Sequence, residues 1–195
     1  MLASEIIARY EAYCPQELSM EGDISGLQIG TLDKEVDKVL VALDIREQTV
    51  AEAIEAGAGL IIVKHAPIFR PLKDLVADKA QNRMILDLIK HDIAVYVSHT
   101  NIDVVEDGLN DWFCQLLDIE ETSFLSQTSP ERGIGRVGRI APQTFGDFAA
   151  KVKASFGLDS LRLVAYEEAD LERVIERVAI CGGSGQSFYP EAIAK

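Results

Sequence analysis

Apolar and polar positions in the first half of the chain follow two alternating patterns. Short apolar runs rich in β-branched residues are typical of buried strands, and apolar residues three or four positions apart are typical of amphipathic helices. The runs 39–43, 60–63 and 93–97 predict strands, and the stretches 46–59 and 77–92 between them predict helices. This alternation is typical of a parallel sheet covered by helices.

Patterns on either side of this region are more varied. A helix is predicted from Ser4 until Pro15 ends it, and the glycine-punctuated stretch 21–30 predicts a loop. The later part of the chain predicts helices at 108–118 and 145–157, an acidic Ser/Thr-rich connection at 118–132, and strands at 133–140, 161–166 and 177–183. Because strands and helices alternate again, a structural duplication is one interpretation.

Composition narrows the class of protein. The 195 residues are 48% hydrophobic and carry a net charge of −13 without a basic patch, which disfavours general nucleic-acid binding. No apolar stretch approaches the roughly 20 residues that a membrane span needs, and the first residues lack the pattern of a signal peptide. Cys14, Cys114 and Cys181 have no CxxC spacing, so we interpret them as reduced thiols without a role. We therefore expect a cytoplasmic globular protein.

Two of the three histidines lie where strands are predicted to end. His65 and His99 follow neighbouring strands, and Asp44 and Asp103 belong to the same set of strand ends. Parallel strands bring their carboxyl ends to one edge, where open α/β sheets bind ligands, so we expect these four residues to converge. Imidazole and carboxylate are usual ligands of divalent transition metals, but structural histidines remain an equal alternative. His91, at a helix end, needs no function.

Two glycine-rich stretches are candidates for backbone chemistry. The stretch 181–188, CGGSGQSF, is either a tight turn or an anion-binding strand-to-helix turn, and the tight turn is favoured because the spacing matches no phosphate-binding motif. Gly133, Gly135 and Gly138 are interpreted as bulge or close-packing positions.

The motifs together resemble one family. The stretches VLVALD, AEAIEAGAGLIIVKHAPIFRPLKDL, VYVSHTNIDVVEDGLN, RGIGRVG and VAICGGSGQSF are similar to those of the GTP cyclohydrolase 1 type 2 homologues, also called NIF-three-like dinuclear-metal proteins. The resemblance implies an α/β fold with mixed, largely parallel sheets, flanking helices and two intertwined similar halves. We assign these halves to residues 1–122 and 123–195. It also implies a homohexamer that holds two metal ions.

The resemblance further implies which residues bind metal. In the family pattern this strand ends in a pair of histidines, and the pair falls on Lys64 and His65. Asp103 matches an aspartate ligand, and His99 matches the histidine of an HTNxD motif. Lys64 cannot coordinate a metal, but its ammonium can sit beside Asp103 in place of an ion. The family's further His and Glu would come from a motif downstream of Lys195, so the second half is expected to lack them.

These expectations lead to alternative functions. The first is a protein that binds zinc, iron or manganese through His65, Asp103 and His99 and hydrolyses a nucleotide-like substrate. The second is a noncatalytic oligomeric scaffold or metal-binding protein with a degenerate site, and Lys64 favours it. The third is an anion-binding module built on Gly182–Gly185. We also expect the 195 residues to bind metal weakly, because stable sites usually need three or four protein ligands.

Overall fold

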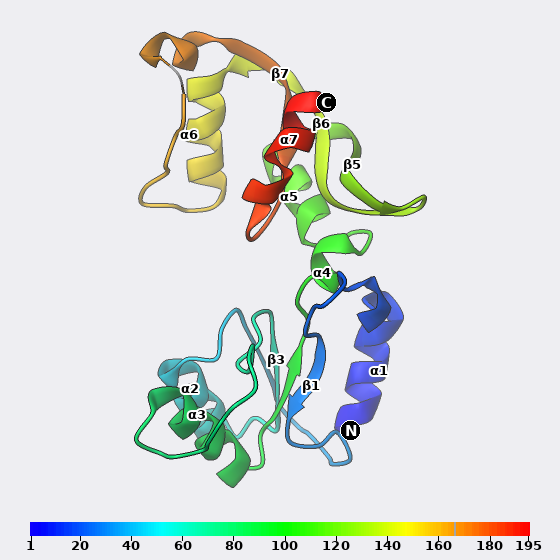
Figure 1. Ribbon diagram of the computed structural model, residues 1–195, viewed down its shortest axis with the longest axis vertical. Coiled ribbons are helices and arrows are strands. Elements are labelled where there is room, and N and C mark those ends of the chain that lie inside the picture. The colour runs from blue at the N-terminus through cyan, green and yellow to red at the C-terminus, as the bar shows by residue number, and fades with distance from the viewer. Residues whose placement is uncertain (166) are drawn as a thin grey trace. The chain divides into compact units, whose positions relative to one another are not determined.

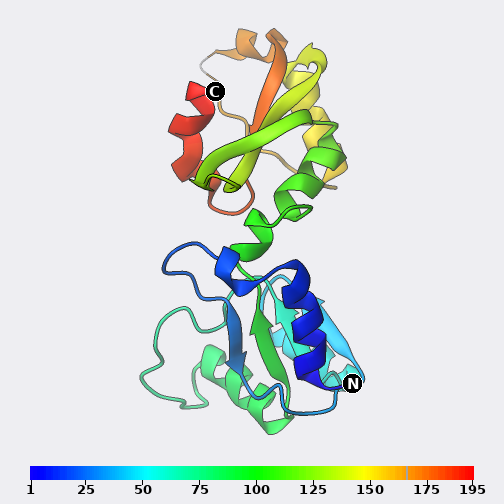
Figure 2. The same ribbon diagram turned by 90° about the vertical axis from the view of Figure 1, so that its right-hand side faces the viewer.

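The computed structural model describes residues 1–165 and 167–195. It contains two compact units, Met1–Val105 and Glu106–Lys195 (Figures 1 and 2). Each unit is one continuous stretch of chain. The second unit begins before the helix predicted at 108–118, because that helix packs into its core. The assignment of the two halves to residues 1–122 and 123–195 stays a prediction.

The first unit contains a four-stranded mixed sheet. Its elements are α1 (Ala3–Tyr13), η1 (Gln16–Leu18), β1 (Gly26–Ile29), β2 (Val39–Ala42), α2 (Glu47–Ala56), β3 (Leu60–Val63), α3 (Ala80–Lys90), β4 (Ala94–Val97) and α4 (Asn101–Val104). The strand order is β1-β4-β3-β2, with β2, β3 and β4 parallel and β1 antiparallel to β4. The three predicted strands and their parallel arrangement are confirmed.

Alternation along β3 explains why helices cover both faces of this sheet. Side chains of successive strand residues point to opposite faces. Ile61 and Val63 pack with residues of α2 and α3, whereas Leu60 packs with Ala3 and Ile7 of α1. Figures 1 and 2 accordingly show α1 on one side of the strands and α2 with α3 on the other.

The second unit contains a three-stranded antiparallel sheet of order β5-β6-β7. Its elements are α5 (Leu109–Leu117), β5 (Glu120–Ser129), β6 (Arg132–Thr144), α6 (Phe145–Ser155), η2 (Glu168–Glu172), β7 (Val174–Ile180), η3 (Gly185–Phe188) and α7 (Tyr189–Ala194). Residues of α5 and α6 share a core with this sheet, and Figure 2 shows these two helices on the same side of it.

Several local predictions were wrong. Residues 26–29 form β1 although a loop was expected, and the predicted connection 118–132 contains β5. Strand β1 is short and begins with a glycine, and β5 exposes most of its side chains. Both therefore lack the apolar alternation that marks a half-buried strand. Residues 161–165 form no strand, and Tyr166 lies outside the described residues. The mixed α/β class is confirmed, whereas the intertwining of similar halves stays a prediction.

Close packing at the β6 glycines is confirmed. A Cβ atom on Gly133 would lie 2.6 Å from Phe124 Cβ, and one on Gly138 would lie 2.5 Å from the carbonyl oxygen of Glu120. Within the described residues, no helix has both the length and the apolar character needed to cross a membrane.

Candidate metal-binding site

Parallel pairing brings the predicted residues to one edge of the first sheet. Ala42 is level with Val63, and Val63 is level with Val97, so the residues that follow these three strands leave the sheet together. The pairing extends past β3, because the amides of Lys64 and His65 donate to the carbonyl oxygens of Ala42 and Leu43. The backbone therefore fixes where the side chains of Lys64 and His65 begin.

His65 is held by a carboxylate of the neighbouring strand end. Its Nδ1 lies 2.7 Å from Asp44 Oδ1, and Arg46 donates to Asp44 Oδ2 at 2.6 Å. The hydrogen bond from His65, followed by that from Arg46, lowers the pKa of Asp44. Because Nδ1 is engaged with Asp44, Nε2 is the nitrogen with which His65 can bind a ligand.

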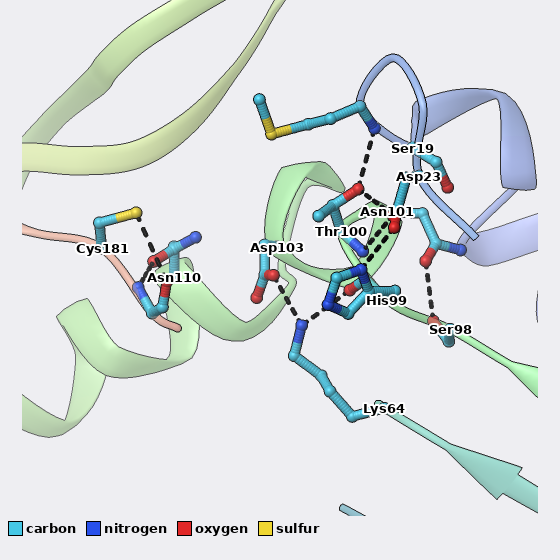
Figure 3. A network of polar contacts seen from close by, with 12 residues as sticks. Ser19, Asp23, Lys64, Ser98, His99, Thr100, Asn101, Asp103, Asn110 and Cys181 are labelled. Carbon is cyan, nitrogen blue, oxygen red and sulfur yellow. Dashed lines mark hydrogen bonds and ion pairs between the residues drawn. The ribbon is translucent and has the colours of Figure 1, made fainter. Parts of the chain in front are cut away.

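His99 has a second carboxylate partner from a distant loop. Asp23 Oδ1 lies 2.5 Å from His99 Nδ1, and Asp23 Oδ2 accepts hydrogen bonds from the amide and the hydroxyl of Thr100 (Figure 3). Burial acts to raise the pKa of Asp23, but the hydrogen bonds from Thr100 and His99 outweigh it and lower this pKa to about 2. Asp23 is thus an ionised anchor that orients His99.

The sequence did not single out Asp23. It lies in the glycine-punctuated stretch that was expected to be a loop, and it is 76 residues from His99. Asp23 approaches His99 because β1, which begins three residues after Asp23, pairs with β4. Nothing in the local pattern around Asp23 indicates that pairing.

The two imidazoles lie near each other. The ring centroids of His65 and His99 are 6.0 Å apart, and the rings are inclined at 70°. Each ring has a carboxylate at Nδ1, from Asp44 and Asp23 respectively. This carboxylate–imidazole arrangement is the one that orients metal-binding histidines in many proteins.

Lys64 and Asp103 form an ion pair beside this histidine pair. Lys64 Nζ is 2.7 Å from Asp103 Oδ2 and 2.8 Å from the carbonyl oxygen of His99. The two side chains are only 16% and 7% exposed. Figure 3 shows Lys64 extending from the end of β3 to Asp103 on α4. The expectation that the ammonium sits beside Asp103 is confirmed.

A buried polar network supports the His99 loop from behind. The hydroxyls of Tyr10 and Ser98 are hydrogen-bonded, Ser98 Oγ donates to Asn101 Oδ1 at 3.1 Å, and Asn101 Nδ2 donates to the carbonyl oxygen of Cys14 at 3.2 Å. Burial raises the pKa of the Tyr10 hydroxyl and of the Cys14 thiol. These groups stay neutral near pH 7, so their role is to hold the loop.

A small cavity opens next to His65. It has a volume of about 220 Å³, and its lining includes Asp44, His65, Pro67, Gln81 and Met84. Drug-sized ligands usually occupy pockets of roughly 300–1,000 Å³. The cavity therefore suits a small group, such as part of a substrate, and not a whole nucleotide.

Comparison with known proteins identifies the family. The whole chain, residues 1–195, matches the family described as Duf34/NIF3 (NGG1p interacting factor 3). The chain belongs to this family. A Streptococcus pneumoniae serotype 4 protein named GTP cyclohydrolase 1 type 2 homolog is 71% identical over 195 residues, which cover all of this chain and 74% of that protein.

Further relatives agree with this assignment. A Lactococcus lactis protein of the same name is 52% identical over 195 residues, again all of this chain and 74% of the relative. The crystal structure of a Bacillus cereus protein related to NIF3 has a TM-score of 0.93 at 27% identity, and the match covers all of this chain and 80% of that one. The Duf34/NIF3 fold is thus shown for the full 195 residues.

The side chains fit the two metal ions implied for such proteins only in part. The described residues include no group of three or more His, Cys, Asp or Glu arranged around a metal position, so the fit is judged residue by residue. His65 and His99 each keep Nε2 for a ligand, because both rings are held through Nδ1. Asp103 suits a second ion less well, because the Lys64 ammonium already lies beside its Oδ2.

The glycine-rich stretch of the second unit has a structural use. The amide of Gly182 donates to Asn110 Oδ1 at 3.0 Å, and Gly183 has φ of +69°, which glycine adopts without strain. The helix that follows, α7, has only six residues. These features agree with the interpretation as a tight turn.

Proposed function

We propose that this Duf34/NIF3 protein binds a divalent metal ion through His65 and His99 and uses it to hydrolyse a nucleotide-like compound. The observation that carries the proposal is the pair of imidazoles, each with Nδ1 bound to a carboxylate and the two rings 6.0 Å apart. Neutral imidazole nitrogens suit zinc, iron and manganese to different degrees, so the geometry leaves the choice among these metals to experiment.

The chain's own residues supply orientation and shape. A bound divalent ion would act as a Lewis acid and lower the pKa of water. Asp44 and Asp23 hold the two rings, and the lowered pKa values of these carboxyls keep them ionised near pH 7. The cavity beside His65 would receive the reacting part of the substrate, while the rest of a nucleotide would extend outside it.

Metal binding and turnover can be measured on the same preparations. Isothermal titration with Zn²⁺ or Mn²⁺ should detect one weakly held ion per chain, since two protein ligands are fewer than the three or four of stable sites. Metal-dependent product release from GTP should follow. His65→Ala and His99→Ala should abolish both, and His91→Ala, which changes an exposed histidine at the end of α3, should leave both unchanged. Metal binding and turnover that persist in both His65→Ala and His99→Ala would refute the proposal.

A noncatalytic metal-binding or scaffold role is the second candidate, and the Lys64–Asp103 ion pair favours it. Asp103 is the carboxylate that could complete a catalytic metal site, and it is already neutralised. Saturable metal binding that His65→Ala removes, together with no turnover of GTP at any metal concentration, would support this role over hydrolysis.

We also propose that the protein forms a homo-oligomer, a hexamer by family resemblance. Strand β2 is at the edge of its sheet, and Val41 and Leu43 are 78% and 59% exposed. Exposed apolar edge strands commonly pair with another chain. Light scattering should show a mass above the 21.4 kDa of one chain, and Val41→Lys should lower it. A monomer at micromolar concentration would contradict this proposal.

We infer a cytoplasmic location from the cysteines. Cys14 and Cys114 are buried, reduced thiols. Reduced thiols are the usual state in the cytoplasm. Fractionation of the source cells would test the inference.

A further inference from the structure

Lys64 places its ammonium beside one oxygen of the Asp103 carboxylate, Oδ2. Its Nζ is 2.7 Å from Asp103 Oδ2, and the same ammonium donates to the carbonyl oxygen of His99 at 2.8 Å. Both side chains are largely shielded from water, at 16% and 7% exposure. In such surroundings an ammonium repels a second cation much more strongly than it would in water.

The position of Lys64 is set by the sheet and not by the ion pair alone. The amide of Lys64 continues the β2–β3 pairing, and successive residues of a strand point to opposite sides. His65 reaches Asp44, and Lys64 reaches Asp103. The strand therefore directs the Lys64 side chain toward Asp103, and a rotation away from it would break both the ion pair and the hydrogen bond to the His99 carbonyl.

We propose that Lys64 is the resident cation of Asp103 and that it removes this carboxylate from the set of metal ligands. The chain then holds at most one divalent ion, at His65 and His99, although Asp103 lies on the same edge of the sheet. This inference rests on the proposed function, because it defines which part of that metal site is open to an ion.

Two substitutions of Lys64 separate its charge from its hydrogen bonds. Lys64→Gln keeps a donor for Asp103 and removes the charge, and Lys64→Arg keeps the charge. Titration with Co²⁺, followed by its visible absorption and by equilibrium dialysis, should show an affinity at least about tenfold higher for Lys64→Gln than for the wild type. Lys64→Arg should bind as the wild type does. Lys90→Gln, in an exposed ion pair with Asp87, is the control for losing a lysine elsewhere.

Asp103 supplies the second half of the test. Asp103→Asn should weaken Co²⁺ binding less than His65→Ala does when Lys64 is present, because it removes a nearby charge and not a ligand, and it should cancel the gain in Lys64→Gln. If Asp103→Asn weakens wild-type binding as much as His65→Ala does, Asp103 is a ligand and the inference is wrong. Equal binding by folded Lys64→Gln and wild type would also overturn it.

The outcomes distinguish this inference from the proposed function. Wild-type protein that binds no ion, combined with a gain in Lys64→Gln, would remove the proposed function and support the role of Lys64. Metal-dependent turnover that is lost in Asp103→Asn would support the function and overturn the role of Lys64. Circular dichroism of every variant identifies any that fails to fold. If Lys64→Gln fails to fold, Asp103→Asn and His65→Ala are compared with the wild type by the Co²⁺-induced change in melting temperature. A change lost in Asp103→Asn as completely as in His65→Ala overturns the inference, and a change that is retained supports it.

Discussion

Replacing Asp23 with asparagine should destabilise the first unit, and the loss should depend on pH. Asp23 is 6% exposed at its side chain and accepts hydrogen bonds from His99 and from two groups of Thr100. These contacts favour the ionised carboxylate, which is why its pKa falls from 3.8 to about 2 despite burial. An asparagine at this position would keep the shape of the side chain and would lose the charge.

The magnitude follows from the pKa of the folded state. A change from 3.8 to about 2 corresponds to about 2.5 kcal/mol, and solvent screening of a partly buried residue reduces this to about 1–2 kcal/mol. Because the folded pKa is depressed, this stabilisation is complete above about pH 4 and is lost as the pH falls toward 2. Asp23→Asn should therefore be less stable than the wild type at pH 7, and the difference should shrink at pH 3.

Urea unfolding followed by circular dichroism at pH 7, 5 and 3 measures this difference. Asp78→Asn, which changes an exposed carboxylate in the segment before α3, is the control and should match the wild type at each pH. Because unfolding of two units need not be two-state, the amide exchange rate of Thr100 gives a local readout. An Asp23→Asn deficit that stays constant from pH 7 to pH 3, or no deficit at all, would refute the account of Asp23 as an ionised anchor.

Two further predictions concern the second unit. Arg136 is 4% exposed and makes paired hydrogen bonds to Asp111. Arg136→Met should lower the free energy of unfolding by about 3–5 kcal/mol, because the Asp111 carboxylate loses its partner. Restored stability in Arg136→Met/Asp111→Leu would support this reason, and an unchanged free energy of unfolding in Arg136→Met would contradict it. Gly138→Ala should cost about 1–3 kcal/mol, since its Cβ would lie 2.5 Å from the Glu120 carbonyl oxygen; thermal melting checks it, and an unchanged melting temperature would show that β5 yields freely.

Prediction from the sequence succeeded where short-range patterns carry the information. The apolar runs of β2, β3 and β4 predicted a parallel sheet, and the parallel sheet placed Asp44, His65 and His99 at one edge. Lys64 beside Asp103 was expected from the family resemblance, and the ion pair confirms that contact. Metal ligation by His65, His99 and Asp103 stays a prediction.

Prediction failed where a strand is exposed or where a segment needs a partner. Strand β5 buries only Leu125 fully among its ten residues, so its sequence looks like a polar connection. Residues 161–165 have the composition of a strand, but the described structure pairs them with no other strand. Local composition does not report whether a partner strand lies alongside.

The sequence by itself determined the α/β class, the three parallel strands and the residues at their carboxyl ends. Periodicity suffices for these features because a buried strand or an amphipathic helix must place apolar side chains at fixed intervals. Only the tertiary structure decided that Asp23 orients His99, because that contact joins residues 76 positions apart through the pairing of β1 with β4. It also decided the division after Val105, since the packing of α5 with α6 and the second sheet depends on contacts that no local pattern records.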